Sequence, residues 1–467
     1  MLQSTGWRFM KVIVCGAGQV GSNIARHLAA ERNDVTIIDQ SPELIRRISE
    51  AYDVQGLVGF ASHPDMLDRA GAADADMLVA VTFADEVNMV ACQVAHSIFD
   101  VPTKIARIRA QSYLRPSFSN LFTRDHMPID VIISPEREVA EAVNRALHMP
   151  GAFDMLPFAD DLVRMIGVHI DSECPIAHQQ LRQLTELFPN LNIIVTGIVR
   201  AGKLFVPTSV DQMLPGDDVY FVVDTDHAAR AMPLFGHDEH EAQRVVIVGG
   251  GNIGLFLGNA LEQQEGKVNL KIVEADRARA ELVAEKLDKA VVLCGNALDT
   301  EIMDEANIAS AHAIVALTND DETNILASLM AKQLGCDTAI TLVNNQAYQS
   351  LVGSLGIDVA IDPRATTVSS ILRHVRRGRI KSVYSLRDGV AEVMEAEALE
   401  TSALVGKPLR EVALPEGVII GAVVRRKAVL KPRGTMVIER DDRVIFFALR
   451  ESVKKLEKLL AVGLDFF

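Results

Sequence analysis

The segment between residues 11 and 39 constrains the fold of this chain more than any other. An apolar, β-branched run is followed by glycines in the spacing G-x-G-x-x-G, at Gly16, Gly18 and Gly21. Apolar residues then recur every four positions, which is the stripe of an amphipathic helix. A second apolar run ends at Asp39, 18 positions after the last glycine. The pattern predicts a β-α-β unit in which a tight turn leads directly into a helix.

Each part of this signature has a mechanical role in binding a nucleotide. Gly16 permits the tight turn, Gly18 lets the backbone approach a pyrophosphate, and Gly21 lets the helix pack on the strand. The first turn of the helix offers free N–H groups and a positive dipole to phosphates, and Asp39 can accept hydrogen bonds from ribose hydroxyls. Because the glycines lie between a strand and a helix and precede an acidic strand end, we favour a nucleotide site over an α/β turn that binds nothing.

Length, charge and cysteine content exclude several classes of protein. The 467 residues exceed one ordinary core and predict about three or four domains. A formal net charge of −15 argues against a nucleic-acid-binding surface, which needs clustered Lys and Arg. The five cysteines form no C-x-x-C pair, so neither a disulfide framework nor a zinc site is indicated, and a reducing cytoplasm fits.

Neither a transmembrane segment nor a signal peptide is predicted. No apolar run approaches the roughly 18 residues that a spanning helix needs. Residues 1–9 lack the long apolar core of a signal peptide, and a second methionine, Met10, directly precedes the first strand. We interpret residues 1–9 as an extension or an upstream start and exclude them from the fold.

The glycine signature is repeated in the second half of the chain. Gly249, Gly251 and Gly254 follow the first triad by 233 positions, and Glu274 follows Asp39 by 235. The segment T-x-x-D-E-x-N, which begins at Thr82 in the first copy and at Thr318 in the second, repeats as well, as do Tyr113 and Tyr348. Two nucleotide modules of the same kind are therefore expected.

A second, different repeat separates the two nucleotide modules. Residues 197–223 resemble residues 421–448, and both consist of short β runs broken by Gly, Pro and Asp. The predicted fold class is α/β, with two Rossmann-like doubly wound parallel-sheet domains alternating with two small β-rich α+β domains. The expected bounds are an extension at 1–9, a first Rossmann-like domain at 10–148, a first small domain at 149–236, a linker at 237–243, a second Rossmann-like domain at 244–378 and a second small domain at 379–467.

Two local features complete the expected organisation. The polar segment from His237 to Glu241 is interpreted as a solvated linker and not as a metal site, because its His and acidic residues have no fixed ligand spacing. A helix is expected near Tyr113.

The sequence resembles the TrkA family of tandem RCK (KTN) proteins, which regulate bacterial Trk potassium uptake. The resemblance covers the chain from Met10 onward and is carried by MKVIVCGAGQVG, the Asp39 strand end, T-x-x-D-E-x-N and the duplicated small modules. It implies a non-catalytic cytoplasmic protein, peripheral to the inner face of the cell membrane, that forms a homotetrameric ring. It also implies gating of a TrkH- or TrkG-type potassium-translocating subunit and binding of NAD⁺ or NADH and of ATP or ADP.

The resemblance further implies two sets of nucleotide contacts. In the first, Gly16, Ala17, Gly18, Gln19, Val20 and Gly21 surround the phosphates, Asp39 holds the ribose, Thr82 and Phe83 border the adenosine, and Arg107 reaches the phosphates. In the second, the corresponding residues are Gly249, Gly250, Gly251, Asn252, Ile253, Gly254, Glu274, Thr318 and Asn319. Leu342 falls where Arg107 stands in the first copy, so an anion there loses a charged partner.

Both acidic strand ends favour an unphosphorylated ribose, because a carboxylate repels a 2′-phosphate. This favours NAD(H) over NADP(H) but does not separate NAD(H) from ATP or ADP.

The main alternative is an NAD-dependent dehydrogenase, which needs a catalytic His, Lys or Tyr beside the nicotinamide. His63 and His312 lie in the repeat but do not match, and matched aromatic residues such as Tyr113 and Tyr348 are more often core. Small modules of about 80 residues leave little room for a substrate pocket, so we favour a sensor without catalysis.

Two further alternatives concern binding. A scaffold that has lost its ligands is disfavoured by the intact glycines and acidic strand ends of both halves. The basic cluster of Arg373, Arg376, Arg377, Arg379 and Lys381 is either a solvated helix face and linker or a contact for a phosphate or a channel.

Overall fold

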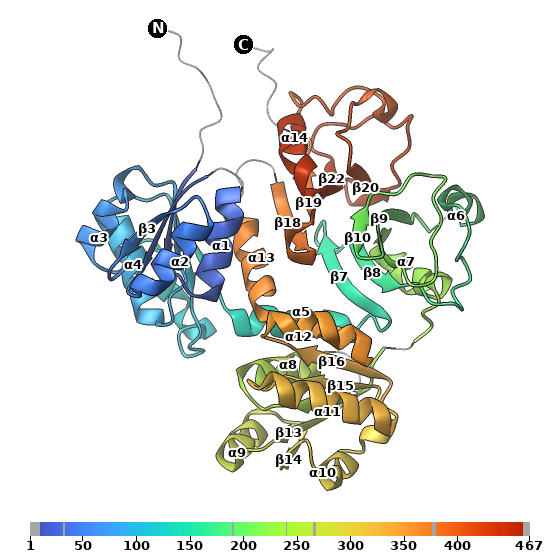
Figure 1. Cartoon of the computed structure of the whole chain (residues 1–467), viewed down its shortest axis with the longest axis horizontal. Coiled ribbons are helices and arrows are strands. Elements are labelled where there is room, and N and C mark those ends of the chain that lie inside the picture. The colour runs from blue at the N-terminus through green and yellow to red at the C-terminus, as the bar shows by residue number, and fades with distance from the viewer. Residues whose placement is uncertain are drawn as a thin grey trace. The chain divides into compact units, whose positions relative to one another are not determined.

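The computed structural model describes residues 10–30, 33–188, 191–239, 241–264, 268–375 and 380–460. Within these ranges the chain forms four β-sheets, two parallel and two antiparallel (Figure 1). It divides into two compact units, Met1–Val139 with Pro363–Val375 and Ala140–Asp362 with Arg376–Phe467. The predicted extension at residues 1–9, His240 of the linker, and Arg376, Arg377 and Arg379 of the predicted basic cluster lie outside the described residues.

The first unit contains a six-stranded parallel sheet in the order β3-β2-β1-β4-β5-β6. Its strands are β1 (Lys11–Cys15), β2 (Asp34–Asp39), β3 (Gln55–Val58), β4 (Met77–Ala80), β5 (Thr103–Arg107) and β6 (Val131–Ile133). The strand order reverses between β1 and β4, and in open α/β sheets ligands bind at the carboxyl ends of strands beside such a reversal.

Helices cover both faces of this sheet because its central strands are apolar on both sides. They are α1 (Gln19–Ala30), α2 (Pro42–Ala51), α3 (Pro64–Arg69) and α4 (Asp85–Ser97). One apolar cluster joins α1 and α2 to the sheet, and a second joins α3 and α4 to its other face. Helix α13 (Pro363–Val375) follows the second parallel sheet in sequence, yet its Val368, Ile371 and Leu372 pack into the α1 side of the first sheet.

The second unit contains a parallel sheet with the same topology, β14-β13-β12-β15-β16-β17. Its strands are β12 (Arg244–Val248), β13 (Asn269–Glu274), β14 (Val291–Cys294), β15 (Ala313–Ala316), β16 (Thr338–Leu342) and β17 (Val359–Ile361). Its helices are α8 (Asn252–Gln263), α9 (Arg277–Lys286), α10 (Thr300–Glu305), α11 (Asp321–Leu334) and α12 (Gln346–Val352). Helix α5 (Pro135–Leu147) follows β6, and the division between the two units falls within it.

The second unit also contains both antiparallel sheets, ordered β10-β9-β11-β8-β7 and β21-β20-β22-β19-β18. The first has β7 (Ala152–Phe158), β8 (Val163–His169), β9 (Ile194–Arg200), β10 (Lys203–Phe205) and β11 (Asp218–Asp224), with α6 (Leu181–Leu187) and α7 (Thr225–Ala231). The second has β18 (Ile380–Leu386), β19 (Ala391–Glu397), β20 (Val418–Arg425), β21 (Ala428–Leu430) and β22 (Arg443–Leu449), with α14 (Arg450–Leu460). We call these the first and second β modules.

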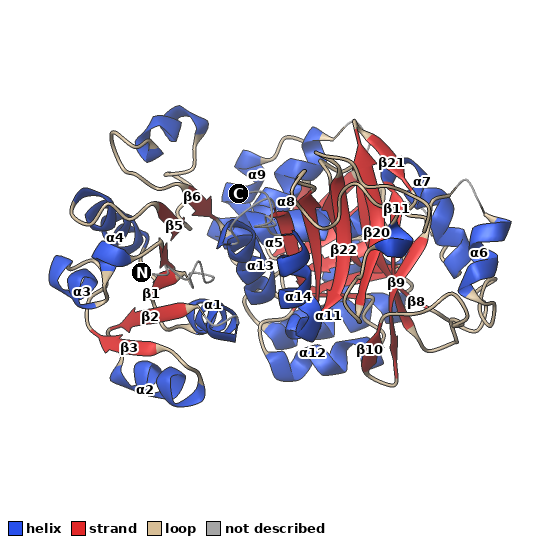
Figure 2. Ribbon diagram, turned by 90° about the horizontal axis from the view of Figure 1, so that it is seen from above, coloured by secondary structure: helices blue, strands red, loops and turns tan. Residues whose placement is uncertain are grey.

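The two β modules pack against each other, and Figure 2 shows the strands of both sheets lying together. One apolar cluster contains residues of both, including Phe158 and Val222 of the first module and Val393 and Phe447 of the second. Each module also has its own core on its other face. Each sheet is therefore buried on two faces, which explains its nearly continuous apolar strands.

Short 3₁₀ helices occupy several connections, namely Ala72–Asp74, Pro116–Phe122, Met232–Phe235, Ile308–Ser310, Gly353–Leu355, Arg387–Gly389 and Leu409–Glu411. No helix among the described residues is both long and apolar enough to cross a membrane.

The predicted fold class is confirmed, because two Rossmann-like parallel sheets alternate along the chain with two small β-rich modules. The helix expected near Tyr113 is wrong, since residues 111–114 form turns. Pro116 accounts for this difference, because it disfavours helical backbone at Arg115, so no helix continues through that position and a 3₁₀ helix begins at Pro116 instead. In the second copy, where no proline follows so closely, Tyr348 does lie in a helix, α12.

Candidate nucleotide sites

The first glycine turn has the geometry that the sequence predicts at two of its three glycines. Gly16 has φ of 108°, a left-handed conformation that favours glycine. A Cβ at Gly21 would lie 1.8 Å from the carbonyl oxygen of Gly16, so only glycine allows helix α1 to start so close to the strand. A Cβ at Gly18 would meet nothing within 4 Å. The protein's own packing therefore does not require glycine at position 18. The space in front of the backbone there is open.

Asp39 holds the glycine turn in place from the end of β2. Its Oδ2 accepts a hydrogen bond from the backbone N–H of Ala17 at 2.7 Å, and its Oδ1 accepts one from Ser41 at 2.8 Å. A carboxylate accepts up to about four hydrogen bonds, so lone pairs remain for ribose hydroxyls. Asp39 thus has a structural role in addition to any role in binding, and its replacement would disturb both.

The second glycine turn reproduces the first. Gly249 has φ of 104°, a Cβ at Gly254 would lie 2.1 Å from the carbonyl oxygen of Gly249, and a Cβ at Gly251 would meet open space. Glu274 Oε2 accepts from the Gly250 N–H at 2.7 Å, as Asp39 does from Ala17. The longer side chain of Glu274 thus accepts the same backbone hydrogen bond from its turn as Asp39 does.

An arginine that we did not predict supports the second turn. Arg279, at the start of α9, donates from Nε to the Gly250 carbonyl at 2.6 Å and from a terminal nitrogen to Asn252 Oδ1 at 3.2 Å. The first copy has Leu44 at the corresponding position. At this position the second turn therefore has a cation, Arg279, where the first has the apolar side chain of Leu44.

The T-x-x-D-E-x-N segment fixes the carboxyl ends of two neighbouring strands. Asn88, which is fully buried, accepts from the Thr82 N–H at 2.9 Å and from the Thr82 hydroxyl at 2.7 Å. Its Nδ2 donates to the carbonyl of Arg107 at 2.9 Å. Asn324 makes the equivalent contacts with Thr318, at 2.8 and 2.7 Å, and with the carbonyl of Leu342 at 3.0 Å. The two copies thus share a buried amide that joins β4 to β5 and β15 to β16.

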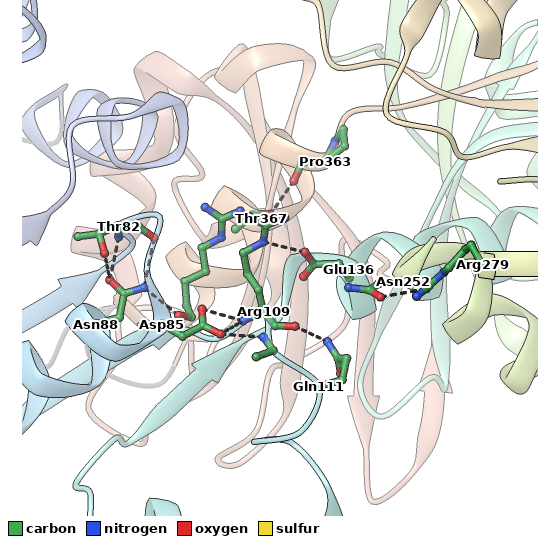
Figure 3. Close-up of polar contacts among 12 residues, drawn as sticks. Thr82, Asp85, Asn88, Arg109, Gln111, Glu136, Asn252, Arg279, Pro363 and Thr367 are labelled. Carbon is green, nitrogen blue, oxygen red and sulfur yellow. Dashed lines mark hydrogen bonds and ion pairs between the residues drawn. The ribbon is translucent and has the colours of Figure 1, made fainter. Parts of the chain in front are cut away.

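Asp85 orders the loop that follows β5. It is buried and accepts hydrogen bonds from the backbone N–H groups of Arg109 and Ala110, the latter at 2.7 Å (Figure 3). Asp321 accepts in the same way from Asn344 and Asn345. These carboxylates therefore do more than complement the dipoles of helices α4 and α11.

Aromatic and charged side chains gather beside the first turn. Phe83, predicted to border the adenosine, is 84% exposed, and the Arg109 guanidinium lies 5.5 Å from its ring centroid. Arg109 Nε also donates to the buried carboxylate of Glu136 at 3.0 Å (Figure 3). Sequence reasoning missed both Arg109 and Glu136. Their one sequence signal is charge at the ends of β5 and β6, where ligands of such sheets bind.

Arg107 ends strand β5, and one nitrogen of its guanidinium lacks a partner among the described residues. Its Nε is buried and has no hydrogen-bond partner among the described residues, and neither do Ser134 Oγ and Glu136 Oε2. Burial lowers the pKa of Arg107, and the like charge of Arg109 lowers it further. Because a buried, unpaired donor is costly, an anion such as a phosphate fits this position.

The remaining predicted residues lie around the two turns. Gln19 and Asn252 are the exposed first residues of α1 and α8, whereas Val20 and Ile253 are half-buried at the next positions. Asn319 is exposed directly after Thr318. Leu342 is buried at the end of β16, so the second copy has an apolar side chain where the first has Arg107. The structure therefore brings the predicted residues of each site to the carboxyl edge of its own parallel sheet.

Two tandem pairs of a Rossmann-like domain and a small β module, with a glycine turn in each Rossmann-like domain, define the architectural class of this chain. The sequence matches the TrkA-N domain model at residues 12–135 and 245–363 and the TrkA-C domain model at residues 165–236 and 393–461. The chain belongs to the TrkA family.

Relatives of the same length support this assignment. The chain is 52% identical to the Trk system potassium uptake protein TrkA of Azorhizobium caulinodans over 458 residues, 98% of this chain and 100% of the relative. It is 42% identical to the protein of the same name from Halomonas elongata, again over 98% of this chain and 100% of the relative.

Solved structures show the same fold. The GsuK RCK domain matches with a TM-score of 0.59 and 16% identity, covering 98% of this chain and 96% of that one. The GsuK channel bound to NAD matches with a TM-score of 0.59 and 16% identity, covering 98% and 80%.

Proposed function

We propose that this protein is the nucleotide-sensing regulatory subunit of a Trk-type potassium uptake system. The observation that carries the proposal is the pair of glycine turns, each closed by an acidic strand end and each with open space before its central glycine, Gly18 or Gly251. The relatives named as Trk potassium uptake proteins supply the transport system. We propose that the four domains have the bounds expected from the sequence, from the first Rossmann-like domain at residues 10–148 to the second small domain at residues 379–467.

The first site fits NAD⁺ or NADH and also ATP or ADP. The backbone from Gly16 to Val20 would hold the phosphates, Asp39 the ribose and Arg107 a further phosphate oxygen. Thr82 and Phe83 would border the adenosine. The fit rests on the orphaned Nε of Arg107 and on the open approach at Gly18, both of which a phosphate group would use.

The second site would use the same backbone, from Gly249 to Ile253, with Glu274 at the ribose and with Thr318 and Asn319 beside the adenosine. Its charge differs, because Leu342 replaces Arg107 while Arg279 stands at the turn. The two sites would therefore bind nucleotides with different affinities. Because the affinities of the two sites would differ, one chain could respond to two nucleotides separately.

Regulation would act by a shift between two assembly states. A nucleotide changes the balance of two states only through its different affinity for each. We propose a cytoplasmic homotetrameric ring at the inner face of the membrane, in contact with a TrkH- or TrkG-type subunit. The protein would have no catalytic role of its own.

Potassium flux into vesicles that carry a TrkH-type subunit tests this function. Added protein should change the flux, and NADH, NAD⁺, ATP and ADP should alter it to different extents without being chemically changed. A flux that does not respond to the protein with any of these nucleotides would contradict the proposal. Turnover of NADH with a small substrate would instead favour a dehydrogenase.

A further inference from the structure

The linker at residues 237–243 joins the first β module to the second Rossmann-like domain, and three of the described histidines take part in its contacts. His237 is its first residue, His148 directly follows helix α5, and His312 directly precedes strand β15. Histidine ordinarily changes its charge between about pH 5 and 8. The partners of each ring nitrogen therefore decide whether the linker is held more firmly with a proton on the ring or without one.

His148 has an oxygen atom beside each of its ring nitrogens. Its Nδ1 lies 2.6 Å from the carbonyl oxygen of Asn144, which can only accept a hydrogen bond, so Nδ1 carries a proton. Its Nε2 lies 3.2 Å from the carboxylate of Glu241 in the linker. A neutral ring would present a lone pair to this carboxylate, whereas a protonated ring presents a positive N–H. The contact with Glu241 is therefore attractive only when His148 is protonated.

His237 has the same arrangement with its two nitrogens exchanged. Its Nε2 lies 2.9 Å from the carbonyl oxygen of His169 and so carries a proton, while its Nδ1 lies 3.4 Å from the carboxylate of Glu239. The ring is packed against the start of the first β module, since a Cβ at Gly151 would lie 2.7 Å from it. A second proton on His237 would turn an unfavourable contact with Glu239 into an ion pair.

His312 has the opposite preference. Its Nδ1 accepts a hydrogen bond from the backbone N–H of Gln243, the last residue of the linker, at 3.0 Å. A protonated Nδ1 cannot accept, so this contact needs the neutral ring. Protonation of His312 therefore releases the end of the linker that borders the second Rossmann-like domain.

The charged groups around these rings do not replace the histidines as partners of the linker. Among the described residues, neither Glu239 nor Glu241 forms an ion pair with a lysine or an arginine. His169 has its own Nδ1 2.9 Å from the carboxylate of Asp218, which also pairs with Arg387, so its ring contacts the β modules and not the linker. Within the described part of the chain, the two glutamates are thus balanced only by the two rings that face them.

We infer that the linker is a proton-sensitive connection: on acidification its first part is held more firmly to the first β module and to the end of helix α5, while its last residue is released from the second Rossmann-like domain. When the pH rises, both preferences reverse. The glutamates are exposed and each contact is weak, so acid shifts the balance between two attachments of the linker and does not act as an all-or-none switch.

Hydrogen exchange of the full-length protein tests this inference. Glu239→Gln/Glu241→Gln removes both carboxylates and leaves every histidine in place. At pH 6 the amides of residues 237–242 should exchange roughly two- to fivefold faster in this variant than in the wild type, relative to the intrinsic rate of each sequence, as expected for partly exposed ion pairs. At pH 8.5 the variant should exchange no faster than the wild type. Glu281→Gln/Glu285→Gln, which removes two exposed carboxylates from α9, is the matched control and should keep wild-type exchange in the linker.

The amide of Gln243 tests the other end of the linker. In the wild type its protection, relative to the intrinsic rate, should fall as the pH is lowered from 8.5 to 6, because a protonated His312 cannot accept. His312→Asn offers a carboxamide oxygen that does not titrate in place of Nδ1. In this variant the protection of the Gln243 amide should not change over the same range.

Equal linker exchange in the wild type and in Glu239→Gln/Glu241→Gln at pH 6 would overturn the inference, and so would a difference of the same size at pH 8.5. Protection of the wild-type Gln243 amide that does not depend on pH would also overturn it. All of these measurements use the protein without nucleotide, so their outcome is independent of the proposed function.

Discussion

Asn88 ties the end of strand β4 to Arg107 at the end of strand β5, donating from Nδ2 to the Arg107 carbonyl oxygen at 2.9 Å. Its other amide atom accepts two hydrogen bonds from Thr82. The Asn88 side chain is fully buried, and its partners on Thr82 and Arg107 are partly buried, so loss of the amide leaves poorly solvated groups without their partner. The contact sets the spacing of two strand ends at which the first site is proposed.

Asn88→Ala should lower the free energy of unfolding by about 1–3 kcal/mol, because buried polar groups lose their partners. Urea denaturation measures this change. Gln93→Ala is the matched control on the same helix, since the Gln93–Ser97 hydrogen bond is exposed, and it should alter the midpoint little. Equal midpoints for the two variants would show that the buried amide does not join the strands as described.

Asp154 in β7 makes stability depend on pH. Burial raises the pKa of this carboxyl from 3.8 to about 6, against the smaller opposing effects of Arg145 and Arg387. Because the folded-state pKa lies above the unfolded value, its contribution to stability is complete below about pH 4 and is lost as the pH rises through about 6.

Asp154→Asn should therefore raise the Tm relative to the wild type at pH 7.5, with the difference disappearing near pH 4. Thermal unfolding of both proteins across this range measures the effect. Asp288→Asn, at an exposed position, is the control for the loss of one carboxylate. A difference in Tm that is constant with pH would be inconsistent with a raised pKa at Asp154.

Arg107→Leu gives the first site the residue that the second site already has. The change removes an unsatisfied buried donor, so the Tm of the ligand-free protein should stay the same or rise. Nucleotide affinity at the first site should fall roughly tenfold or more, because a charge-assisted hydrogen bond to phosphate is lost. Calorimetric titration tests this, with Arg46→Leu on the exposed side of α2 as the control. An unchanged nucleotide affinity would show that Arg107 does not contact the nucleotide.

The local part of each site could be predicted from the sequence. Gly16, Gly21 and Asp39 lie within one β-α-β unit, and their spacing fixes their relation before any other part of the chain is placed. The repeat then predicted the second turn and Glu274 without further information. What spacing could not predict is that both carboxylates also hold their own glycine turns.

Long-range contacts could not be predicted in the same way. Asp85 accepts from backbone groups 24 and 25 residues later, and no local pattern identifies such a partner. The apolar stripe of α13 predicts a buried helix but not which sheet it covers. Arg279 could have been found by comparing the two copies at Leu44, as the comparison of Arg107 with Leu342 was made.

The open space at Gly18 is the feature on which the first nucleotide site depends most directly, and isothermal titration of Gly18→Ala tests it. Position 18 does not have a left-handed backbone, and a Cβ there meets no protein atom within 4 Å, so the variant should keep the wild-type Tm. This separates it from Asp39→Ala, which would also disturb the glycine turn. Gly251→Ala is the matched change in the second site.

We predict that NADH, NAD⁺, ATP and ADP bind the wild type, and that Gly18→Ala weakens binding at the first site while Gly251→Ala affects only the second. Loss of binding with an unchanged Tm would support a nucleotide sensor with its phosphates at these turns. Wild-type affinity in both variants would contradict the central claim.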